Sequence, residues 1–125
     1  MEQYYFIDNT QVVSIDIFPI NSPNPYVETI GKTYSIKDMS TLIQIKHELK
    51  RAESTQLQHP EVTKTFRLQL NTSGDSYDYV VKMTTNQGIL FTIFINDYYY
   101  LNLKGDRIVQ MIHNSTGDKF FVNDR

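Results

Sequence analysis

The segment from Lys64 to Leu103 most constrains what this chain can fold into, because it reads as four strands separated by tight-turn residues. The predicted strands are Lys64–Leu70, Tyr77–Thr84, Ile89–Ile95 and Tyr98–Leu103. In the first strand Phe66 and Leu68 alternate with Arg67 and Gln69, the period of two that indicates one buried and one solvated face. Turns rich in Asn, Gly and Asp favour antiparallel hairpins. The third strand is apolar on both faces, which predicts a central position in the sheet.

Other strands are predicted on both sides of this run. Candidates are Tyr4–Asp8, Val12–Phe18, Lys32–Ile36 and an edge strand at Phe120–Val122. Pro19, Pro23 and Pro25 predict an irregular loop, because proline lacks a backbone donor and restricts the preceding residue. Arg107–His113 is predicted as a strand from its β-branched residues, and a short helix capped by Asp106 is the alternative.

A single amphipathic helix is predicted after Asp38, a residue type that is favoured at helix N-caps. Its apolar residues recur at steps of three and four and form one stripe: Met39, Leu42, Ile45, Leu49 and Ala52. Charged residues, including Lys46, Glu48 and Arg51, are assigned to a solvated outer face. We therefore expect the helix to pack across one face of the sheet.

The order of these elements predicts a single α+β domain over residues 1–125. We expect a mostly antiparallel β-meander of about six to seven strands, with one amphipathic helix on one face. A small, partly closed β-barrel with one helix is the alternative fold. The 40% hydrophobic and 21% charged residues fit a globular chain, and a single Ala argues against a helical bundle.

Charge and cysteine content exclude several classes of function. The net charge is −2 and the Lys and Arg residues are scattered, so nucleic-acid binding is not expected. The absence of Cys excludes disulfides, thiolate catalysis and cysteine-based zinc sites. No signal peptide or membrane span is recognisable, so we expect a cytoplasmic protein if Met1 is the native start. A cell-envelope location is expected instead if the natural protein carries a signal segment before this domain.

The chain shows no recognisable catalytic, cofactor or metal motif. His47, His59 and His113 are not at metal-ligand spacing, and neither a G-x-S-x-G elbow nor a glycine-rich phosphate loop is present. Asn71-Thr72-Ser73-Gly74-Asp75 resembles a calcium loop only in part, because Lys82 stands where a bidentate Glu is required. We predict no catalytic residue, no cofactor and no bound metal, and hence a protein that is not an enzyme.

The run Tyr98-Tyr99-Tyr100 is the least ordinary local feature. On a strand Tyr98 and Tyr100 share one face and Tyr99 takes the other, so at least one ring is expected to be partly exposed. Tyr77 and Tyr79 on the neighbouring hairpin extend the same candidate patch. Tyr is enriched at binding surfaces because it combines a large rigid area with a polar tip. The alternative is that these are half-buried aromatics of the sheet.

These observations favour a non-enzymatic module that binds an unknown protein partner through a Tyr-bearing sheet face or an edge strand. The residue composition is typical of AT-rich bacterial genomes, Gram-positive ones included. Among bacterial proteins, the candidate roles are an inhibitor, an immunity protein or the extracytoplasmic domain of a small envelope lipoprotein. A second hypothesis, from another class, is a small-ligand-binding protein or accessory enzyme with a site between helix and sheet, near His47 or His113.

Overall fold

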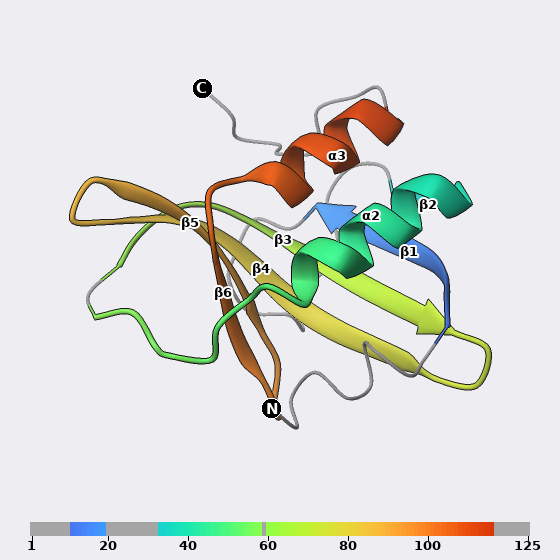
Figure 1. The fold of residues 1–125 in the computed structure, drawn as a ribbon, viewed down its shortest axis with the longest axis horizontal. Coiled ribbons are helices and arrows are strands. Elements are labelled where there is room, and N and C mark those ends of the chain that lie inside the picture. The colour runs from blue at the N-terminus through green and yellow to red at the C-terminus, as the bar shows by residue number, and fades with distance from the viewer. Residues whose placement is uncertain (1–10, 20–32, 59, 117–125) are drawn as a thin grey trace.

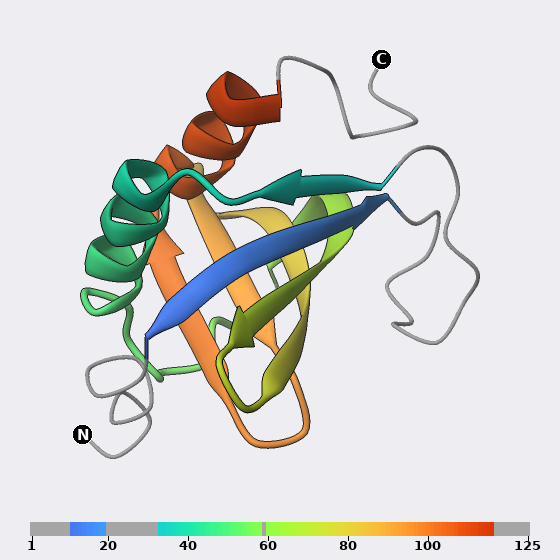
Figure 2. The same ribbon diagram turned by 90° about the vertical axis from the view of Figure 1, so that its right-hand side faces the viewer.

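The computed structural model describes residues 11–19, 33–58 and 60–116. Its elements are β1 (Val12–Pro19), β2 (Tyr34–Ile36), α2 (Met39–Leu49), β3 (Glu61–Thr72), β4 (Ser76–Asn86), β5 (Ile89–Ile95), β6 (Tyr100–Lys104) and α3 (Arg107–Thr116). The six strands form one antiparallel sheet in the order β2-β1-β3-β4-β5-β6. Both helices lie on the same side of this strongly twisted sheet (Figures 1 and 2). The α+β class is confirmed, and the sheet is open rather than a closed barrel.

The strands form where apolar residues alternate with polar ones. In β3, Phe66, Leu68 and Leu70 are buried, while the residues between them are half-buried on the opposite face. Leu68 and Leu70 pair with Ile17 and Ile15 of β1, so their side chains lie side by side beneath the helices. The predicted strands at Val12–Phe18, Lys64–Leu70, Tyr77–Thr84 and Ile89–Ile95 are confirmed, most of them with longer ends.

The β5 strand is apolar on both faces, as predicted, because Ile93 and Phe94 are both 1% exposed. It pairs on both sides, but the middle of the sheet is formed by β3 and β4. The turn before it uses Gln87 and Gly88, whose φ angles are 54° and 80°. Two consecutive positive φ angles are typical of the type I′ turn, whose twist matches that of the flanking strands.

The strand predicted at Arg107–His113 is wrong, because this segment belongs to helix α3. Ile108, Val109 and Ile112 are all buried, the spacing of one helical face, whereas a strand would put Val109 on the other face. Gly105, with φ 91°, turns the chain away from the sheet edge. Packing against the core therefore outweighs the strand preference of the β-branched residues, and the fold has two described helices instead of one. The segments Tyr4–Asp8 and Phe120–Val122, with Pro23 and Pro25, lie outside the described residues.

The predicted helix is confirmed as α2, with Asp38 as its N-cap. The Asp38 carboxylate accepts hydrogen bonds from the backbone N–H of Thr41 at 3.0 Å and from the Thr41 hydroxyl at 2.7 Å. Leu42, Ile45 and Leu49 face the core, but Met39 is 48% exposed and does not share their burial. The apolar stripe of α2 therefore starts one turn later than the sequence predicts.

The N-cap makes stability depend on pH in the acidic range. Hydrogen bonds from the Thr41 hydroxyl, and then from its backbone N–H, lower the pKa of Asp38 below the ordinary value of 3.8. A carboxyl group whose pKa is lower in the folded than in the unfolded state stabilises the fold at pH values above its unfolded-state pKa. This stabilisation is lost as the pH falls through the folded-state pKa. We expect Asp38→Ala to lower the urea midpoint at pH 7 and to have a smaller effect at pH 2.5. Asp97→Ala, at an exposed turn residue, is the control, and an undiminished Asp38→Ala effect at pH 2.5 would contradict the ionic cap.

Candidate functional site

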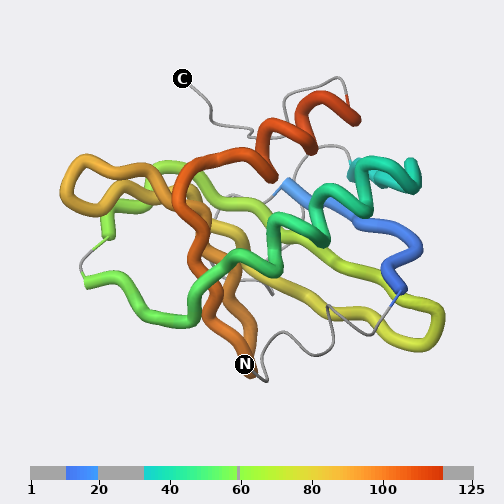
Figure 3. The backbone as a smooth tube through the Cα atoms, viewed as in Figure 1, coloured from blue at the N-terminus to red at the C-terminus, as the bar shows by residue number. Residues whose placement is uncertain are grey.

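The described residues cover only part of the outward edge of β6. Glu53 forms a two-bond bridge to Asn102: its N–H donates to the Asn102 carbonyl at 2.9 Å, and the Asn102 N–H donates back at 2.7 Å. The Asn102 side chain donates to the carbonyl of Thr55, and the N–H of Leu57 donates to the Tyr100 hydroxyl at 3.2 Å. The connection that follows α2 thus lies beside the first part of β6, as the tube view shows (Figure 3).

The connection that follows α2 no longer lies against β6 at Lys104. In an antiparallel strand, alternate residues direct their backbone groups to the same side, so Lys104 directs its N–H and C=O outward as Asn102 does. Continuing the register of the Glu53 bridge would place Arg51 opposite Lys104. Arg51 instead donates its N–H to the Glu48 carbonyl at 3.0 Å, as part of the last turn of α2. The chain therefore diverges from the sheet edge at this point.

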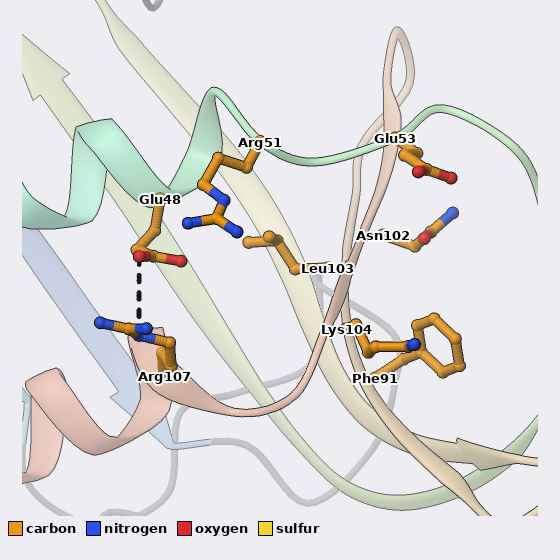
Figure 4. A pocket seen from close by; sticks show the side chains of 8 residues that line it. All are labelled: Glu48, Arg51, Glu53, Phe91, Asn102, Leu103, Lys104 and Arg107. Atoms are coloured by element: carbon orange, nitrogen blue, oxygen red, sulfur yellow. Dashed lines mark ion pairs between the residues drawn. The ribbon is translucent and has the colours of Figure 1, made fainter.

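A pocket of about 400 Å³ lies in the gap where the two segments diverge. It joins the end of α2, the edge of β6 and the start of α3 (Figure 4). Its lining residues are Glu48, Arg51, Glu53, Phe91, Asn102, Leu103, Lys104 and Arg107. Five of these eight side chains are charged, so this is a polar site at the margin of the apolar core.

Glu48 was assigned to the outer face of the helix from the sequence, and the structure corrects this. Its side chain is only 11% exposed, and its Oε2 lies 3.6 Å from the Nε of Arg107. The Arg107 side chain is 74% exposed, so water screens this ion pair on one side. Among the described residues, neither Arg51 nor Lys104 has an ion-pair partner within 4.0 Å. The lining has three cationic and two anionic side chains, a net charge of +1.

The five candidate tyrosines do not form one continuous surface. Tyr79 is buried and meets Phe94 edge to face, with 6.2 Å between ring centroids. Tyr77 and Tyr99 are partly buried and pack against the same core. Burial, and then the nearby Tyr99 and Tyr77, raise the pKa of Tyr79 above its ordinary value. These three rings therefore belong largely to the hydrophobic core.

Tyr98 and Tyr100 have different surroundings. The Tyr100 hydroxyl accepts the hydrogen bond from Leu57 and so helps to hold the connection along β6. Tyr98 precedes β6 and is 85% exposed. It lies in a turn because the Asn96 side-chain oxygen accepts hydrogen bonds from the N–H groups of Tyr98 at 2.9 Å and Tyr99 at 2.8 Å. The predicted start of the last strand at Tyr98 is therefore wrong by two residues.

Neither His47 nor His113 lines the pocket. His47 is exposed on α2 and His113 is half-buried on α3, while His59 lies outside the described residues. In the described ranges there is no group of three or more His, Asp or Glu side chains that could hold a metal ion. The pocket lining offers positive charge and hydrogen-bond donors from Arg51, Lys104 and Arg107.

No protein-family model, curated protein or solved structure matches this chain. Neither α2 nor α3, the helices of the described residues, is long and apolar enough to cross a membrane. The described fold and site define an α+β protein with an open antiparallel sheet and a charged pocket at one sheet edge.

Proposed function

We propose that this protein is a non-enzymatic binding module that engages another protein through the turn between β5 and β6, with Tyr98 as the main contact residue. The observation that carries this proposal is an aromatic side chain that is 85% exposed on an ordered turn. A partner that covered this ring would remove a large apolar area from water while leaving its hydroxyl free to hydrogen-bond.

The conformation of the turn supports this role. Besides the two bonds to the Asn96 side chain, the backbone N–H of Asn96 donates to the Tyr99 carbonyl at 3.0 Å. Because these hydrogen bonds already fix the conformation of the turn in the free protein, little conformational entropy is lost when a partner binds. More of the contact energy then contributes to affinity. Tyr also has few rotatable bonds and is enriched among the residues that dominate interface energetics.

The sheet edge offers less to a partner than the turn does. The bridge from Glu53 and the hydrogen bond from Leu57 cover the outer side of β6 at Asn102 and Tyr100. Within β6, Lys104 is the one residue whose outward backbone groups have no partner among the described residues, and one residue is too short to pair with a long partner strand. An inhibitor, an immunity protein or the extracytoplasmic domain of a bacterial envelope lipoprotein would each fit recognition through an exposed turn.

Photo-cross-linking tests this proposal directly. A benzophenone amino acid placed at position 98 should capture a discrete protein in the native host, and the same group at exposed Gln110 of α3 should not. With that protein purified, we expect Tyr98→Ser to weaken binding by roughly thirtyfold, the loss typical of a dominant interface residue.

Tyr98→Phe should retain most of the affinity, because it keeps the ring and leaves the Asn96 turn intact. Equal cross-linking from positions 98 and 110 would contradict a specific surface at the turn. Unchanged affinity of Tyr98→Ser would likewise exclude Tyr98 as the main contact residue.

A further inference from the structure

We propose that the pocket beside Lys104 binds the carboxylate of a small organic anion whose apolar body lies against Leu103. This site is separate from the proposed protein-binding turn. Tyr98 precedes one end of β6, whereas the pocket lies at the other end. The two proposals can therefore fail independently.

The pocket has more donors for an anion than its own acidic groups occupy. The Arg51 guanidinium has no ion-pair partner among the described residues. The Lys104 ammonium also has none, but it lies on the other side of β6, beside Phe91 (Figure 4). The backbone N–H of Lys104 points outward from the sheet edge without a protein acceptor in the described chain. A carboxylate can take two parallel hydrogen bonds from a guanidinium and still accept one from a backbone N–H.

The start of α3 also borders the pocket, with Asp106 directly before it. Helix α3 has ten residues and begins at Arg107, which itself lines the pocket. The unpaired N–H groups at a helix N-terminus and the helix dipole both favour a nearby anion. Figure 4 shows the guanidinium groups of Arg51 and Arg107 on the same side of β6 as the Glu48 carboxylate. Because Glu48 pairs with Arg107, Arg51 is the cation that stays available to a ligand.

Charge balance favours a carboxylate over a phosphate. The lining carries a net charge of +1, which one carboxylate neutralises. A phosphate dianion would leave a net negative charge beside Glu48, whose carboxylate is largely removed from water and poorly screened. The ligand is therefore expected to carry one negative charge.

The apolar part of the lining determines the rest of the ligand. Leu103 is partly buried and contributes branched apolar surface on the side of β6 that carries Arg51, whereas Phe91 lies on the other side, beside Lys104 (Figure 4). A volume of about 400 Å³ lies within the usual range for small-molecule pockets, and such sites commonly combine apolar walls with a few polar groups. An arylacetic acid combines one carboxylate with one apolar body.

Titration of the ¹⁵N-labelled full chain with phenylacetate tests the site. We expect saturable shifts at the amides of Lys104, Gly105 and Arg107, with a Kd roughly in the millimolar range for so small a ligand. Arg51→Gln should weaken binding by roughly tenfold, because it removes a charge-assisted pair of hydrogen bonds. Lys37→Gln removes a positive charge at the opposite end of α2 and should leave the affinity unchanged.

Neutral phenylacetamide provides the matched ligand control. Equal binding of the amide and the acid would overturn the carboxylate assignment, and tighter binding of inorganic phosphate than of phenylacetate would do the same. Unchanged affinity in Arg51→Gln, with the remaining amide shifts showing an intact fold, would also overturn it. Tyr98→Ser should leave the phenylacetate titration unaltered, which separates this site from the proposed protein-binding turn.

Discussion

Phe94→Ala is expected to lower the free energy of unfolding by roughly 3–5 kcal/mol, the usual loss when a buried aromatic ring is removed from a core. Phe94 is 1% exposed, and its ring meets that of Tyr79 edge to face. Its strand neighbours across the sheet are Val81 and Leu101, which are also fully buried. Few of the surrounding atoms can move into the vacated space, because strands on both sides hold β5 in place.

A loss of this size is a large part of the roughly 5–15 kcal/mol that stabilises a typical domain. Urea denaturation followed by circular dichroism measures it, provided that the denaturant slope is unchanged. Phe91→Ala is the matched control, because Phe91 lies on the other face of the same strand and is only half-buried. Equal losses in the two variants would contradict the assignment of Phe94 to the main core.

The second large effect is expected in α3. Ile112→Ala should lower the free energy of unfolding by roughly 2–4 kcal/mol, because the side chain is 0% exposed and its removal leaves a cavity. Alanine favours helices, so the loss would come from packing and not from helix propensity. The same urea measurement applies, and a loss close to zero would mean that α3 does not pack on the core as described.

A pair of neighbouring residues separates a helix from a strand in this segment. In the helix, Val109 is buried with Ile108 and Ile112, whereas Gln110 is exposed. In a strand, position 110 would share the buried face and position 109 would not. Val109→Ala should therefore destabilise the protein clearly and Gln110→Ala hardly at all, and the reverse order would contradict the helix.

The strands and α2 could be predicted because their signals are local. Alternation in β3 and β4, the Gly88 turn and the Asp38 cap each act within a few residues of chain. The prediction for the α3 segment was wrong for the opposite reason. Its β-branched residues favour a strand locally, and only the space available on the sheet face selects the helix.

The pocket could not be predicted from the sequence, because it depends on where the chain leaves a sheet edge. Arg51 and Lys104 are more than fifty residues apart, and nothing local indicates that they approach each other. Glu48 looked like one more charge on a solvated helix face, and its burial follows only from the position of α3. Alternation predicts that Tyr98 and Tyr100 share one face of a strand, but the Asn96 turn leaves Tyr98 outside the strand, and that turn was missed.

The bridge between Glu53 and Asn102 also affects how the protein behaves at high concentration. An uncovered edge strand is a template on which further chains can pair, and this is a common route to aggregation. Here the chain occupies that edge with its own backbone, and a lysine stands at the residue left open. At the opposite edge β2 is only three residues long. Both described margins of the sheet therefore disfavour growth by strand addition, so self-association through the sheet should be weak.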